Sequence, residues 1–379
     1  MTKKIISFLF AFLIVFLSQN EVQAGVVCTG TACQYIPQNI MNELQTIDVS
    51  LQKQYTDKVM SSMSEAAVLT NLNSGMIGKG SVNRFELGLG AGAAGVKNDD
   101  IIIKHGETVL PKMPNMGVAL SPTLAAGVNL GWLLGGGAAD KASKKNLLHR
   151  ISLYAHGFSY KFNNGNIDRY TPDGMSMYGS ISNAGVMARF QLFQEKNTML
   201  KLLGFNGLSL GLGYNYQRQA VHANYQDKNV PTVNFGPVEG SWAGETKLDL
   251  DSRVRSTVFD LRTGFRVLYA LTFLVGIGTS VNTGTSDLNV ERSGPFRLGT
   301  DLSLYSASPE LAKYLNSTNT KFDQEGNLSL SLKGHGKPEY RVHYVIAGTE
   351  INIANFKILL EGYMAEKSYA ANLGFKFAL

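Results

Sequence analysis

The sequence has few cysteines, histidines and charged residues, and each shortage excludes a class of protein. Two cysteines and six histidines in 379 residues, with no H-x-E or H-E-x-x-H spacing, argue against a metal site. Beyond the N-terminal end, no apolar run reaches the roughly 18 residues that indicate a membrane-spanning helix. The mean hydropathy of -0.04 also argues against a bundle of membrane helices.

Motifs for other chemistry are missing too. The sequence contains no G-x-S-x-G motif and no glycine loop that opens a helix for a phosphate group. We therefore expect no catalytic residue, no cofactor and no metal. The formal net charge of +6 comes from basic residues interleaved with acidic ones, so we expect no nucleic-acid partner.

Glycine and aromatic residues are plentiful, with 40 Gly, 16 Tyr and 19 Phe. The pattern that the aromatic residues follow is clearest at the end of the chain. From Tyr369 to Leu379 every second residue is aromatic, Leu or Ala, and the residues between them include Asn372 and Lys376. A period of two places the two sets on opposite faces of a β-strand, and the segment has about the 9–11 residues that a tilted strand needs to cross a bilayer.

The same alternation recurs from residue 81 onward and predicts ten strands. The number becomes twelve if Leu298–Tyr305 and Leu328–Leu332 form full strands of their own. The polar connections are alternately long and short along the chain, as in barrels with long external loops and short periplasmic turns. With an even number of strands, both ends of this domain fall on the periplasmic side.

In this terminal strand pattern the chain resembles the outer-membrane β-barrel proteins of Gram-negative bacteria. It departs from them at its end, where Ala378 and Leu379 follow the aromatic Phe377. The resemblance implies an all-β transmembrane antiparallel barrel over residues 81–379, located in the bacterial outer membrane. It also implies three kinds of partner: outer-membrane lipid with lipopolysaccharide, the barrel-assembly machinery, and a surface ligand.

Residues 1–24 have the pattern of a secretory signal peptide. Lys3 and Lys4 precede an apolar run from Ile5 to Leu17, and Val22-Gln23-Ala24 is a small-residue cleavage site. Two alternatives are weaker. A retained anchor helix needs a longer run, and a lipoprotein modified at Cys28 needs small residues where Val26 and Val27 stand.

Cys28 and Cys33 are the only cysteines. In an oxidising envelope, a local disulfide between them is the expected outcome. Free thiols are the alternative, since two thiols alone do not make a metal site. We interpret the pair as a structural disulfide that fixes the N-terminus left after removal of the signal peptide.

Residues 25–80 are expected to form an N-terminal periplasmic segment with one amphipathic helix. From Pro37 to Asn73 apolar residues recur every three or four positions, and Asn73-Ser74-Gly75 is a stop signal. The first expectation for this helix is packing beside the periplasmic base of the barrel. A plug or gate inside the barrel is the second.

Charged residues in the middle of strands are expected to face the barrel interior, because Arg or Lys at the middle of the lipid face costs about 2–4 kcal/mol. They would form either a packed ion network or the lining of a narrow pore with mild anion preference. The predicted lumen residues are Arg84, Glu86, Arg189, Lys247, Asp249, Asp251, Arg253, Arg255, Arg341, His343, Lys357, Glu361 and Lys376.

The function predicted from these features is that of a small channel or porin-like transport protein. The alternative is a surface barrel without a conducting pore that serves as a structural or ligand-binding, adhesin-like protein. An outer-membrane enzyme is the third hypothesis. Gly334-His335-Gly336 and Asp99-Asp100 lack the spacing and neighbours of omptin-like protease sites, so we predict that the chain is not an enzyme.

Overall fold

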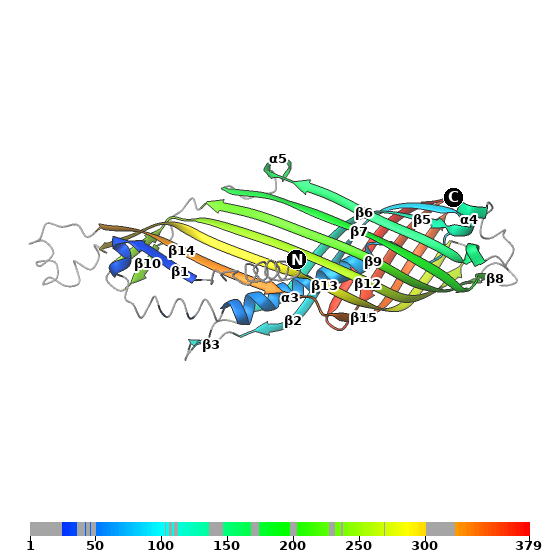
Figure 1. Ribbon diagram of the computed structural model, residues 1–379, viewed down its shortest axis with the longest axis horizontal. Helices are drawn as coiled ribbons and strands as arrows, with labels where there is room; N and C mark the ends of the chain where they lie inside the picture. The colour runs from blue at the N-terminus through cyan, green and yellow to red at the C-terminus, as the bar shows by residue number, and fades with distance from the viewer. Residues whose placement is uncertain are drawn as a thin grey trace, which may run out of the picture.

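The computed structural model describes most of the chain as one long barrel that continues into a sheet at one end (Figure 1). The expected signal peptide, residues 1–24, and much of the stretch before residue 51 lie outside the described residues. The structure describes residues 25–35, 42, 46, 51–102, 104–105, 108–109, 113–135, 147–167, 174–197, 203–226, 232–235, 238–268, 270–300 and 323–379.

Ten antiparallel strands form a closed ring. In ring order they are β2 (Phe85–Ile101), β5 (Met113–Asn129), β6 (Ile151–Phe162), β7 (Met175–Phe193), β9 (Leu203–Gln226), β12 (Glu245–Val267), β13 (Leu271–Thr300), β15 (Arg341–Ile353), β16 (Phe356–Met364) and β17 (Ser368–Ala378). The ring closes where β17 pairs with β2, for example at Phe375 and Leu89. The predicted transmembrane barrel fold and its strand number of ten are confirmed.

The remaining elements lie outside this ring or within it. They are β1 (Gly25–Gly30), η1 (Thr31–Tyr35), η2 (Gln52–Thr56), α3 (Asp57–Asn73), β3 (Lys104–His105), β4 (Thr108–Val109), α4 (Leu130–Gly135), η3 (Leu147–Arg150), α5 (Asn164–Ile167), β8 (Lys196–Asn197), β10 (Thr232–Phe235), β11 (Val238–Trp242) and β14 (Asp323–Gly336). β14 contains Leu328–Leu332, one of the two extra candidate strands, but it pairs with β13 and β1 outside the ring.

The two ends of the barrel differ. At one end, here called the turn end, the C-terminal strand finishes beside the start of β2, and the amide of Leu379 donates to the carbonyl of Phe85 at 3.0 Å. Leu268, Ala270 and Asn355, in short connections between strands, also lie at this end. At the other, the loop end, β12 and β13 run on past the ring (Figure 1), and β13 pairs there with β11 and β14.

The outward face of the ring is apolar. Large side chains that are about half exposed there come from every strand of the ring, and they include Leu89, Leu124, Leu153, Val186, Leu212, Phe259, Ile277, Val345, Leu360 and Phe375. A closed ring leaves no unpaired strand edge, which lets backbone cross hydrocarbon without unsatisfied polar groups. The chain is therefore an outer-membrane β-barrel, as the sequence predicted.

The N-terminal segment departs from its predicted position. β1 pairs with β14 at the loop end, from Gly25 opposite Ser331 to Gly30 opposite Gly326. Helix α3 lies inside the barrel, in contact with strands around the ring and with β14. In the described part of residues 25–80, β1 joins the sheet of the barrel and α3 follows the second expectation, a helix inside the barrel, and not packing beside its base.

Candidate functional site: the filled lumen

Helix α3 approaches the wall most closely where the wall has glycine. A Cβ atom on Gly117 of β5 would overlap the backbone of Ser62, and one on Gly336 of β14 would overlap the backbone at Met60 and Ser61. These two glycines lie on different strands that pack against the same helix. Glycine is needed here because any side chain would push the helix away from the wall.

Hydroxyl groups on α3 bind polar side chains of the wall. Ser62 Oγ lies 2.9 Å from Asn115 Oδ1, and Ser64 Oγ lies 2.7 Å from Ser286 Oγ. Nearer the turn end, Thr70 Oγ1 donates to Gln217 at 3.2 Å. The Oγ atoms of Ser74, just after the helix, and Ser121 are 2.5 Å apart. The helix is thus fixed along its length by bonds to different strands.

Apolar side chains fill the space between these bonds. Val68, Leu69 and Leu72 are at most 3% exposed and belong to one cluster with wall residues. The wall members of this cluster include Tyr154, Met187, Val254, Val258, Val342, Tyr344, Ile346 and Tyr363. From Ala66 to Asn73 every residue of α3 is buried, so the barrel encloses this half of the helix on all sides and not along a single apolar stripe.

Below the helix, toward the turn end, a network of ion pairs lies inside the lumen. Asp260 lies between two arginines, 2.5 Å from Arg189 and 3.0 Å from Arg262. Arg262 also pairs with Glu361 and donates to the hydroxyl of Tyr363. These ionic side chains are at most 3% exposed, so burial removes their charges from water at a cost in free energy. Attraction between the paired opposite charges offsets this cost.

A second group of ions is centred on Glu86. Its carboxylate pairs with Lys357 and lies 3.6 Å from the ammonium group of Lys376. Lys376 also donates to the carbonyl of Ile77 at 3.2 Å. This bond ties the segment after α3 to the last strand of the barrel.

Glu195 marks the edge of the turn end, in the connection after β7. It accepts from Lys79 at 2.8 Å, from Ser81 at 3.0 Å and from Arg266 at 2.9 Å. Although burial alone would raise the pKa of Glu195, Lys79 and Arg266 lower it to about 2. The chain between α3 and β2 is thus bound to the turn end of the barrel.

The structure brings some of the predicted lumen residues together inside the barrel. Glu86, Arg189, Lys357, Glu361 and Lys376 point inward and take part in the two ion groups. Arg84 precedes β2 and is exposed at the turn end.

The charged stretch of β12 faces the other way. Lys247, Asp249, Asp251, Arg253 and Arg255 lie on the outward face, contrary to expectation, while Ser252, Val254 and Ser256 between them are buried inside. On β15, Arg341 and His343 also face outward, and Val342 and Tyr344 face inward. The expectation assumed that these residues lie within hydrocarbon. They lie toward the loop end, where β12 continues past the bilayer and the cost of an outward charge is small.

Sequence reasoning missed Asp260, Arg262 and Glu350, which are all buried in the lumen. For Asp260 and Arg262 the sequence does contain a signal that they face the lumen. They alternate with Phe259, Leu261 and Phe265, and a charged residue between large apolar neighbours on a strand points away from the lipid.

The described residues contain no group of three or more His, Cys, Asp or Glu side chains placed to hold a metal ion. No helix in the described part of the chain is both long and apolar enough to span a membrane. The prediction that the chain is not an enzyme stays a prediction.

A protein-family model described as Lsa36-like matches residues 21–379. No curated protein matches the chain. Solved structures similar to it include the toluene transporter TbuX of Ralstonia pickettii, at 12% identity over 84% of this chain and 93% of that one, with a TM-score of 0.23. Another is the translocator domain of the autotransporter NalP from Neisseria meningitidis, at 7% identity over 78% and 88%, with a TM-score of 0.28.

A third is a FadL homologue of Pseudomonas aeruginosa, at 8% identity over 85% of this chain and 98% of that one, with a TM-score of 0.28. TM-scores this low say nothing about ligand or mechanism. The strand pairings of the chain itself carry the assignment of its fold.

Proposed function

The chain belongs to the Lsa36-like family, and we propose that it is a sealed outer-membrane barrel that binds ligands at the cell surface through its loop end. The observation that carries the proposal is the position of α3, which is bonded and packed to several strands inside the ring. In the part of the chain that the structure describes, α3 occupies the space inside the ring, which supports a barrel without a conducting path. The part that remains available to a partner is the loop end.

The loop end is built as a continuous sheet. β1 and β14 extend the sheet of β12 and β13 beyond the ring. The disulfide of Cys28 and Cys33 packs in a small apolar cluster with Trp242 and Phe296. A rigid platform of this kind loses little conformational entropy when it binds a partner, which favours recognition.

Orientation is the first point to test. Arg297 is exposed at the loop end and Asn355 is exposed in a turn at the opposite end. We expect Arg297→Cys to react with a membrane-impermeant maleimide on intact cells, and Asn355→Cys to react only after the outer membrane is opened. Labelling of Asn355→Cys alone on intact cells would show that the loop end faces the periplasm and would end the proposal.

Conductance is the second test. The purified wild-type protein, inserted into a planar bilayer, should leave the current at the level of the lipid alone. Stable single-channel steps from the wild type at low voltage would contradict a sealed lumen. Heat-modifiable migration on a denaturing gel confirms that the inserted protein is a folded barrel.

A small channel is the second candidate function, and one feature favours it. The wall that faces α3 carries polar side chains, among them Ser121, Gln217, Ser252, Ser286 and Asn372, all buried. Polar walls would suit water if the helix moved. In that case the helix acts as a gate.

A cross-link distinguishes a gate from a permanent seal. Ser64 and Ser286 have Oγ atoms 2.7 Å apart, so Ser64→Cys with Ser286→Cys should form a disulfide that fixes α3 to β13. If the reduced variant conducts under applied voltage and the oxidised one does not, α3 is a gate. Equal absence of current in both forms supports the sealed barrel.

A further inference from the structure

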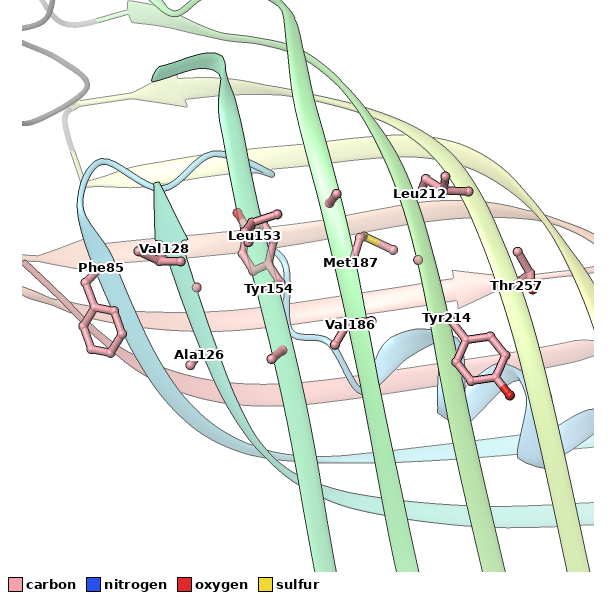
Figure 2. Close-up of a pocket in the computed structure, with 14 residues that line it drawn as sticks. Phe85, Ala126, Val128, Leu153, Tyr154, Val186, Met187, Leu212, Tyr214 and Thr257 are labelled. Atoms are coloured by element: carbon pink, nitrogen blue, oxygen red, sulfur yellow. The ribbon is translucent and has the colours of Figure 1, made fainter. Parts of the chain in front are cut away.

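The outward face of the barrel has a shallow apolar hollow. Figure 2 shows it across strands β5, β6, β7, β9 and β12, with Leu153, Val186 and Leu212 among the residues that line it. Its volume is about 700 Å³, which lies within the range of about 300–1,000 Å³ for ligand sites.

Small side chains on adjacent strands create the hollow. Ala126 of β5 lies opposite Ala155 of β6, and Ala188 of β7 lies opposite Leu153. All four face outward, on the side of the barrel where the lipid lies. The wall is therefore thin there, and the hollow is shaped for hydrocarbon.

A second, polar pocket lies on the same face nearer the loop end. It has a volume of about 400 Å³, and Lys161, Tyr178, Ser180, Arg218 and His222 are among its lining residues. These residues come from β6, β7 and β9, three of the strands that carry the apolar hollow. The ring of Tyr178 stacks on that of His222, with centroids 4.7 Å apart.

Around the pocket, Lys161, Arg218, Arg253 and Arg255 stand against two carboxylates, those of Asp251 and of Asp249, which lies 2.6 Å from His222. Asp251 is shared by Arg218, at 2.8 Å, and Arg253, at 2.7 Å. No ion pair of Lys161 or Arg255 is present within the described part of the chain. Arg255 lies opposite Tyr216, between the pocket and the hollow. The excess positive charge is thus at the height where the outward face changes from apolar to polar.

The spacing of hollow and pocket matches one lipid molecule. Along β6, Ala155 in the hollow and Lys161 in the pocket are about 20 Å apart, and along β9 Tyr214 and Arg218 are about 14 Å apart, at roughly 3.4 Å per residue. Because barrel strands tilt by about 35–45°, these separations are roughly 15 and 10 Å along the membrane normal, within one leaflet of about 15 Å, half of the roughly 30 Å core. A chain in the hollow would therefore place its headgroup at the basic pocket.

We infer that β6, β7 and β9 form a binding site for one phosphorylated lipid of the outer leaflet, with an acyl chain in the hollow and a phosphate at Lys161 and Arg218. A phosphate accepts two parallel hydrogen bonds from a guanidinium group, and Lys adds a point charge. Basic side chains near a membrane surface attract anionic headgroups. The inference depends on the loop end facing the cell surface, which is part of the proposed function.

The test is native mass spectrometry of the full-length barrel released from bilayers of phosphatidylcholine with a small fraction of either lipid A or phosphatidic acid. The wild type should retain one phosphorylated lipid in preference to phosphatidylcholine. Lys161→Gln with Arg218→Gln should lower this retention at least tenfold, and so should Ala155→Trp, which fills the hollow. Arg297→Gln removes an exposed charge far from the pocket and should change nothing.

Three outcomes would overturn the site. They are equal retention of phosphatidylcholine, unchanged retention by both sets of variants, and full displacement of the lipid by millimolar inorganic phosphate, which would indicate a site for free anions only. Heat-modifiable migration of every variant separates these results from misfolding. A wild type that stays in solution without lipid would instead refute the membrane barrel itself.

Discussion

At the scale of single residues, Gly117 tests how closely helix and wall pack. A Cβ atom there meets the backbone of Ser62, so we expect Gly117→Ala to displace α3 and to lower the free energy of unfolding by about 1–3 kcal/mol. The measurement is urea unfolding of the barrel in detergent micelles. The matched control is Gly95→Ala on β2, where a new Cβ would lie 4.0 Å from the carbonyl oxygen of Gly117. Equal effects of the two changes would contradict close packing at Gly117.

Arg262 tests the ion network below the helix. Its removal leaves Asp260 with Arg189 alone and leaves Glu361 buried without its cation. We expect Arg262→Met to destabilise the barrel by about 3–5 kcal/mol, the cost of breaking a buried ion pair by removing one partner. Arg297→Met, which breaks an exposed pair with Glu325, should cost less than about 1 kcal/mol. The unfolding midpoints of both variants in urea decide the point.

Glu195 gives a dependence on pH. Its pKa is about 2 in the folded barrel and 4.5 in its ordinary state, so its ion pairs contribute fully above pH 5 and are lost as pH falls from 4.5 to 2. Glu195→Gln should therefore destabilise the barrel at pH 7 by about 2 kcal/mol, with allowance for its partial exposure. The difference between wild type and variant should disappear near pH 2 in urea titrations at each pH. A difference that stays constant with pH would mean that the charge is not involved.

The residue scale also shows where sequence reasoning ends. Alternation separates the residues of β12 into two sets, but it does not say which set faces the lumen. The charges of Asp249 and Arg253 suggested the wrong answer, because the strand is longer than the bilayer. Asp260 and Arg262, further along the same strand, lie within the membrane and follow the rule. Whether a charged side chain faces the lumen depends on the depth of the residue in the bilayer. That depth can be assigned only from the strand register of the whole ring.

At the scale of elements, strands were predictable and the place of the helix was not. A strand pattern has one outward apolar face whatever its neighbours are, so the ten strands follow from local sequence. The apolar stripe of α3 fits the base of the barrel as well as its interior. The observation that decides is the pairing of β1 with β14, which places the chain before the helix at the loop end. Pairings between strands about 300 residues apart are not encoded in either segment alone.

The disulfide gives a prediction at this scale. Cys28 and Cys33 fix β1 and η1 against Phe296 of β13, at the far end of the chain that leads into α3. Cys28→Ser with Cys33→Ser should speed amide hydrogen exchange in β1, and leave the exchange of β16 and β17 unchanged. A small closed loop contributes about 2–3 kcal/mol at most, which is enough to release one edge strand and too little to open the ring. Loss of heat-modifiable migration in the variant would show that the whole barrel needs the disulfide in order to fold.

At the scale of the whole molecule, the structure is a ring of strands around a core supplied by its own N-terminal chain. α3 has 17 residues, about 25 Å at 1.5 Å per residue, which is nearly the thickness of the hydrocarbon layer. Its polar bonds and apolar contacts replace the water that a ring of this size would otherwise hold. The wall does not depend on the helix for its hydrogen bonds, because every strand of the ring is paired on both sides.

Replacing residues 57–73 by a Gly/Ser linker of equal length should therefore show whether the ring of strands folds without α3 inside it. We expect the ring to form, with heat-modifiable migration retained and an unfolding midpoint well below that of the wild type. The polar wall should then hold water, and planar bilayers should show ion conductance that the wild type lacks. A linker variant that folds but does not conduct would mean that the ion network around Arg262 and Glu86 closes the barrel by itself. Adding Arg262→Ala with Lys357→Ala to the linker variant tests this, because a lumen sealed only by these ions should then begin to conduct.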